Sequence, residues 1–161
     1  MRIRNPNDLF FDQLRDIRSV ECQVILTLPE LAEKAEAPSL RAWLQDHEEM
    51  TSRHKQAVLS IFERHGEDPG GDICKAMKGL IDGGNAHLAK TEDAVVRDLL
   101  LVAHCNRIKH YEIAAYEFTT ALAGRIGFPR DQQELAAILE EETSATQALA
   151  AIASGLFGAN V

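Results

Sequence analysis

The sequence predicts an all-α protein, a bundle of four long helices with a short extra helix in one connection. Three observations predict it. Aromatic residues make up 6% of the 161 residues, and Pro occurs five times. Apolar residues recur at helical spacing through four long segments. Clusters of Gly and Pro separate those segments. The length suits a single domain over residues 1–161, with a core from about 8 to 153 and a C-terminal tail over 154–161.

The first helix is expected from Leu9 to about Lys34, with Asn7 or Asp8 as its N-cap. Pro29 lies inside this periodic segment, and its ring removes one hydrogen bond of the helix. We therefore expect a kink one turn before it, the alternative being an early end.

The second helix is expected from Leu40 to about Arg64, after the break at Ala37-Pro38-Ser39. His47 and His54 share its inward face, because they are seven residues apart. The cluster of Gly and Pro in residues 66–71 then ends the helix.

The segment Ile73–Ala89 reads as a connection that carries a short helix, interrupted at Gly83-Gly84. It is long enough to return the chain to the other end of a bundle. A long connection between the second and third helices distinguishes ferritin-like bundles from simple up-and-down bundles. The predicted fold is therefore ferritin-like.

The third long helix is expected to begin near Thr91 or Asp93 and to continue to about Arg125. The fourth opens around Asp131 and ends before Gly155. The segment that follows is small and apolar, and we expect it to be loosely held or docked on a neighbour.

A glutamate interrupts the apolar face of three of the four long helices, where the pattern calls for a hydrophobic residue. These are Glu21, Glu112 and Glu142, and His54 lies on the inward face of the remaining helix. Burying an unpaired carboxylate costs several kcal/mol. In a bundle the four side chains can converge, and a cation would relieve their repulsion. Carboxylate and imidazole ligands suit iron, manganese or zinc more than calcium.

Two alternatives to a metal site stay open. Arg18, Arg107 or protonated histidines can neutralise the carboxylates, or some carboxylates can point to solvent at a helix edge. Tyr111 and His110 are candidates for hydrogen bonds to a ligand, and His110 is equally well placed to be exposed.

The composition excludes several function classes. A net charge of −8 and a pI near 5.2 argue against nucleic acid or an anionic membrane as the main partner. No apolar run reaches the roughly 18 residues of a transmembrane helix, and charges interrupt the N-terminus where a signal peptide has its apolar core. We expect a cytoplasmic protein. Cys22, Cys74 and Cys105 form no CxxC pattern, so neither a disulfide framework nor a zinc site is predicted.

Several segments carry a resemblance to a known family. They are SVECQ (19–23), HEEMT (47–51), CKAMKGLI (74–81), HYEIA (110–114) and EETSAT (141–146). The chain resembles the YciF/YciE-type ferritin-like family from Leu9 to about Ala151. The resemblance implies a ferritin-like four-helix bundle with an extra helix, usually dimeric and linked to bacterial stress responses. It also implies a two-metal carboxylate site whose ligands match Glu21, His54, Glu112 and Glu142.

The sequence departs from the family pattern near that site. Met50 and Thr146 stand where the family usually has a glutamate and an aspartate, and Lys109 stands where it is usually acidic. A thioether and a hydroxyl are poor ligands for iron. One metal, a weaker pair of metals, or none therefore become alternatives to a full di-iron site, and His47 or Glu49 could substitute in part.

Two functional hypotheses follow. In the first, the protein binds iron or a similar metal and uses it for redox chemistry with oxygen or peroxide. In the second, it is a non-catalytic structural or interaction protein whose metal site is partly or wholly lost. Whether the protein is an enzyme is left open, and no substrate is identified by the sequence.

Overall fold

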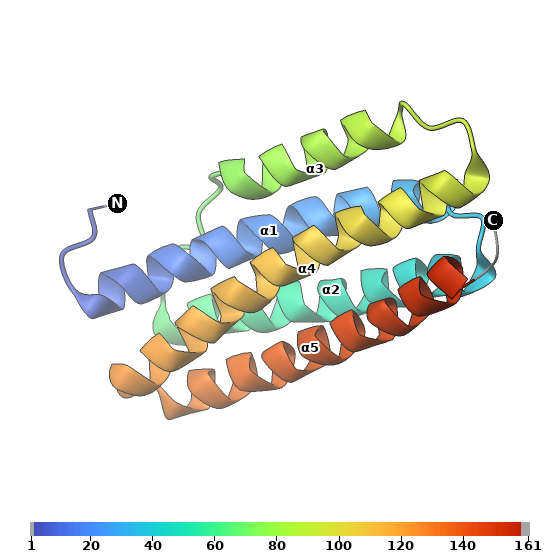
Figure 1. Ribbon diagram of the computed structural model, residues 1–161. Helices are drawn as coiled ribbons and strands as arrows, with labels where there is room; N and C mark the ends of the chain where they lie inside the picture. Colours follow the sequence, from blue (N-terminus) through green and yellow to red (C-terminus); the bar gives the residue numbers. More distant parts are fainter. Residues whose placement is uncertain (1, 159–161) are drawn as a thin grey trace.

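The computed structural model describes residues 2–158 and contains five helices. They are α1 (Pro6–Lys34), α2 (Pro38–His65), α3 (Lys75–Leu88), α4 (Ala94–Arg125) and α5 (Pro129–Gly158). Four of them are long and lie alongside one another, while the shorter α3 packs on the outside of α1 and α4 (Figure 1). The prediction of an all-helical protein is confirmed. Across residues 2–158, no helix is long and apolar enough to cross a membrane.

α1 begins three residues earlier than expected. The side chain of Asn5, rather than Asn7 or Asp8, caps it by accepting a 2.9 Å hydrogen bond from the backbone N–H of Asp8. Pro6 follows at the first helical turn, where a missing N–H costs nothing. The helix also continues through Pro29 to Lys34, so the alternative of an early end is wrong.

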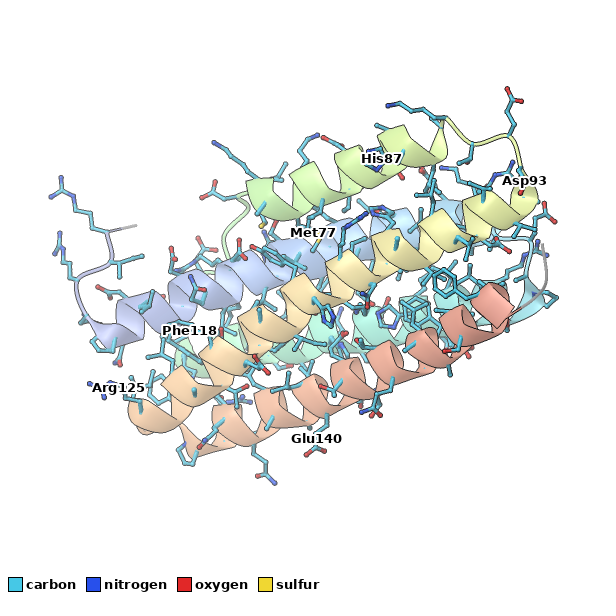
Figure 2. All side chains as sticks on the ribbon, viewed as in Figure 1. Met77, His87, Asp93, Phe118, Arg125 and Glu140 are labelled. Carbon is cyan, nitrogen blue, oxygen red and sulfur yellow. The ribbon has the colours of Figure 1, made fainter. Side chains whose placement is uncertain are left out.

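α3 is continuous through Gly83-Gly84, and the predicted interruption is wrong. A Cβ atom added at Gly84 would lie 2.0 Å from the ring of His104 on α4. The glycine is therefore a point of close approach between two helices rather than a break. Figure 2 shows Met77 on the side of α3 that faces the bundle, and its side chain is fully buried.

α5 extends beyond its predicted end. It runs through Gly155 to Gly158, because small residues without proline allow the helix to continue at the modest cost of a glycine. Residues 154–158 of the expected tail are therefore helical, and residues 159–161 lie outside the described residues. The three cysteines are free, as predicted.

Two buried aspartates fix the ends of α2. Asp98 on α4 accepts hydrogen bonds from two successive backbone N–H groups, at residues 36 and 37, in the α1–α2 connection, at 2.9 and 2.7 Å. Asp131 on α5 accepts from Arg64 and His65, each at 2.6 Å. These contacts set the position of α2 along its neighbours, and so the depth at which its inward residues lie.

The apolar core consists of two clusters along the bundle. The first contains Val24, Leu44, Met77, Leu101 and Leu149, and the second contains Phe10, Leu14, Val58, Tyr116 and Leu135. Along each long helix, the sequence passes from one cluster to the other near the middle. Polar residues that lie at this crossing are enclosed by apolar layers on both sides, which lowers the local dielectric.

The contact at Gly84 predicts a sharp difference between adjacent glycines. Gly84→Ala should destabilise the protein by about 2 kcal/mol, because the new methyl group overlaps the buried His104 ring. Gly83→Ala, which meets nothing within 4 Å, should be neutral or stabilise by up to about 1 kcal/mol through helix propensity. Urea unfolding of both variants measures the difference. Equal destabilisation of the two would contradict the close approach.

The burial of His104 should also make the free energy of unfolding depend on pH. Burial, followed by the nearby Arg107, lowers its pKa to about 4, from 6.5 in the unfolded chain. The neutral ring therefore contributes stability above pH 6.5, which is lost as the pH falls towards 4. Between pH 7 and pH 5 the loss should be about 2 kcal/mol. In His104→Gln the free energy of unfolding should fall less over this interval, whereas the exposed His110→Gln should behave as wild type.

Candidate metal centre

The structure brings the four predicted residues into the middle of the bundle. Glu21, His54, Glu112 and Glu142 come from α1, α2, α4 and α5, and each is between 0% and 2% exposed. Two groups of donor atoms form, and they share Glu142. The groups are Glu21–His54–Glu142 and His47–Glu112–Glu142, and within each the donor atoms lie within 4.8 Å of one another. The helix periodicity thus predicted both the faces and the common depth.

Lys109, which the sequence analysis places near the site as a departure from the family pattern, is a member of the cluster itself. Its side chain is 1% exposed, and its Nζ contacts Glu112 Oε2 and Glu142 Oε2. Among the neutralising groups considered from sequence, Arg107 is exposed and Arg18 approaches Cys22 Sγ. The available signal was spacing, since Lys109 lies three residues before Glu112 and so on the same face of α4.

His54 joins a buried carboxylate to a half-exposed one. Its Nδ1 lies 3.0 Å from Glu142 Oε1, and its Nε2 lies 2.9 Å from Glu141 Oε2. Hydrogen bonding from His54 and from Arg53 outweighs burial and lowers the pKa of Glu141. If Nε2–H donates to Glu141, then Nδ1 and Glu142 Oε1 are two facing acceptors. Such a pair requires a proton or a metal ion between them.

Tyr116 supplies the hydrogen bond expected from Tyr111 or His110. Its fully buried hydroxyl donates to Glu21 Oε1. Glu21 Oε2 has no hydrogen-bond partner among residues 2–158. His110 is exposed, and the Tyr111 hydroxyl donates instead to Asp16 at 2.9 Å. Glu21 is therefore oriented by a tyrosine one turn beyond Glu112, and one of its oxygens is available to a ligand.

The carboxylates differ strongly in pKa. Burial, reinforced by the other two carboxylates, raises the pKa of Glu21 well above its usual range. Burial likewise raises the pKa of Glu112 to about 8, although Lys109 opposes it. For Glu142, Lys109 and His54 outweigh burial and lower the pKa to about 2. The two carboxylates similarly outweigh burial at Lys109 and raise its pKa. The metal-free cluster is thus close to neutral, with one ammonium facing one firmly ionised carboxylate.

His47 lies between this cluster and the surface. Its ring stacks on Trp43, with centroids 4.8 Å apart and planes at 4°. Burial and the charge of Lys109 lower its pKa to about 3, so the ring is neutral at neutral pH. In the described part of the chain, neither ring nitrogen has a hydrogen-bond partner. His47 lines a groove of about 730 Å³ between α2 and α5, together with Met50, Arg53 and Glu141. Glu140 on the rim points away from the bundle in Figure 2.

Met50 and Thr146 supply no carboxylate to the cluster. Met50 is half-buried and lines the same groove. The Thr146 hydroxyl donates to the backbone carbonyl of Glu142 at 3.0 Å. The family resemblance implies an acidic ligand at each of these two positions. Because neither residue here is acidic, each donor group has only three residues.

The donor set fits one metal ion but not two. In the second group, the ammonium of Lys109 already contacts two of the three donor residues, Glu112 and Glu142. The first group has a glutamate oxygen without a partner and a histidine nitrogen that faces a carboxylate. Two carboxylates and one imidazole suit iron, manganese or zinc.

Solved structures similar to this protein include ferritin-like ones. A ferritin-like, diiron-carboxylate protein from Bacillus anthracis superposes with a TM-score of 0.73 at 12% identity, covering 94% of this chain and 99% of that one. At this identity the likeness concerns the fold alone. YcfI from Rhodopseudomonas palustris superposes with a TM-score of 0.88 at 32% identity, covering 91% of this chain and 94% of the other.

The Escherichia coli stress protein YciF superposes with a TM-score of 0.94 at 28% identity, covering 98% of this chain and 100% of that chain. In sequence, protein YciF of Escherichia coli strain K12 is 31% identical over 143 residues, which are 88% of this chain and 86% of YciF. A family described as a domain of unknown function, DUF892, matches residues 5–161. The chain therefore belongs to the DUF892 family, and YciF is one of its relatives.

Proposed function

We propose that this protein is a ferritin-like, stress-associated protein that binds one divalent metal ion through Glu21, His54 and Glu142. The observation that carries the proposal is the first donor group, in which three buried side chains from three helices meet and Lys109 is ion-paired with one of them, Glu142. Iron is the metal we favour, with manganese and zinc as alternatives that the same ligands accept. The diiron-carboxylate description of the Bacillus anthracis neighbour agrees with a metal in this fold.

The surrounding residues prepare the ligands. The Tyr116 hydroxyl donates a hydrogen bond to Glu21 Oε1, while Glu21 Oε2 has no hydrogen-bond partner among residues 2–158. With a metal bound, a hydrogen bond from His54 Nε2–H to Glu141 would hold the tautomer whose Nδ1 lone pair points inward. The metal, when bound, would supply redox chemistry with oxygen or peroxide at its open coordination positions. The chain's own part is to exclude bulk water and to fix the donors.

Glu112, the fourth residue predicted as a ligand, has a different role in this proposal. It faces Lys109 and belongs to the second donor group. We assign it to the charge balance of Lys109 in the wild-type chain, and to the metal only where that lysine is absent.

The wider assignments follow the family resemblance. We propose a ferritin-like topology in which the long connection from α2 to α4 carries α3, a homodimer, and a cytoplasmic location. The topology is supported by the relative YciF, a stress protein whose solved chain superposes over its whole length. The homodimer and the location rest on the family resemblance alone.

A second candidate is a structural or interaction role without metal. Two observations favour it. Lys109 neutralises part of the cluster from within the chain, and the relative YcfI is described as a candidate structural protein. In this case the buried polar cluster specifies the packing of the bundle rather than a reaction.

Metal analysis decides between the two candidates. Protein freed of metal and then loaded anaerobically with Fe²⁺, or with Mn²⁺ or Zn²⁺, should retain about one ion per chain after desalting. Glu21→Gln should reduce retention at least tenfold, because the ligand loses its charge. The exposed Glu117→Gln on α4 is the matched control and should retain metal as wild type does.

The position of the ion is tested by an anomalous-scattering map of the loaded crystal. A peak between Glu21, His54 and Glu142 is expected. Absence of retained metal in the wild type after loading would overturn the metal-binding proposal and leave the structural role. Equal retention by Glu21→Gln would show that the ion binds elsewhere.

A further inference from the structure

We infer that Lys109 acts as a built-in substitute for a second metal ion, so that this chain carries a latent metal site closed by its own ammonium group. The latent site consists of His47, Glu112 and Glu142. The contacts of Lys109 alone support the closure of this site. Only the expected count of one ion in the wild type rests on the proposed function.

The first argument is position. The two donor groups share Glu142, which is the arrangement of two adjacent cation sites joined by a bridging carboxylate. Lys109 Nζ contacts Glu142 and Glu112, which are the two acidic members of the second group. The ammonium therefore pairs with the same two carboxylates that a second cation would need.

The second argument is burial. The Lys109 side chain is 1% exposed, so water cannot solvate its ammonium group. The buried charge is stabilised instead by its contacts with Glu112 and Glu142. Conversely, those carboxylates come from α4 and α5, and without a cation they could avoid repulsion across the helix interface only by taking up protons. Because the ammonium is attached to the chain, it cannot dissociate, and it is present at every metal concentration.

The third argument is that His47, the remaining donor of the latent site, lacks hydrogen-bond partners. His47 is 2% exposed, and within residues 2–158 both of its ring nitrogens lack hydrogen-bond partners. It is the third member of the group that Lys109 enters. A neutral buried imidazole without a partner is costly in a structural polar core, but it is an ordinary metal ligand.

The fourth argument is space. A cavity of about 10 Å³ lies beside the lysine stem, lined by residues that include His47, Cys105 and Lys109. It is too small for more than a single water molecule. Because His47 and Lys109 both line it, a shorter side chain at position 109 would enlarge a cavity that already borders one donor of the latent site.

The test compares wild type with Lys109→Met, which keeps an unbranched side chain as far as the ε position and removes the ammonium. In EDTA the thermal midpoint of the variant should fall by about 10 °C, because the carboxylates lose their cation. Added Mn²⁺ or Zn²⁺ should restore it, and the metal count should rise by about one ion per chain relative to wild type. Lys78→Met, which removes an exposed ammonium paired with Asp82, should change neither quantity.

The outcomes separate this inference from the proposed function. If wild type binds one ion and Lys109→Met also binds one, without a metal-dependent recovery of its midpoint, the substitution of metal by Lys109 is wrong while the first site stands. If wild type binds none and the variant binds one, Lys109 closes a site as inferred and the proposed function fails.

A measurement on the wild type keeps the inference testable if the variant does not fold. Crystals of the wild-type protein soaked in Zn²⁺ should show no anomalous peak between His47, Glu112 and Glu142. A peak there, with the Lys109 side chain displaced, would overturn the inference.

Discussion

The ion cluster that joins Lys109 of α4 to Glu112 and to Glu142 of α5 is the interaction on which the centre of this protein depends. Three carboxylates lie where an all-apolar bundle would have hydrophobic residues. In a medium of low dielectric such charges are tolerated only when they are neutralised at short range. A covalently attached ammonium neutralises Glu142 without an external partner, and the raised pKa values of Glu21 and Glu112 favour the protonated form of the other two carboxyl groups. The fold can therefore assemble around a polar centre before any metal is present.

The rest of the bundle holds that centre in place. Apolar clusters enclose it on both sides along the helix axes. Asp98 and Asp131 fix the ends of α2, which positions His54 opposite α5. His54 then bridges two successive glutamates of α5, one buried and one at the surface groove. The same contacts that fix the helix register thus also fix the distances between candidate ligands.

Membership of the DUF892 family establishes the fold more firmly than the chemistry. YciF and this chain share nearly the whole bundle, and a diiron-carboxylate protein shares the fold at 12% identity. A fold of this kind carries metal chemistry through a handful of inward side chains. In this chain one of those inward side chains is a lysine. One residue can therefore change the charge at the centre of the bundle while the backbone stays the same.

Helical periodicity in the sequence was sufficient to predict the all-helical class, four long segments and the common depth of Glu21, His54, Glu112 and Glu142. That is because periodicity reports which face of a helix turns inward. It does not report where a long flexible side chain ends, so Lys109 became a member of the cluster only in the tertiary structure. Likewise Gly84 resembles a helix break in sequence, and only the ring of His104 on another helix explains it. Contacts between helices decided these points, since they depend on neighbours that are distant along the chain.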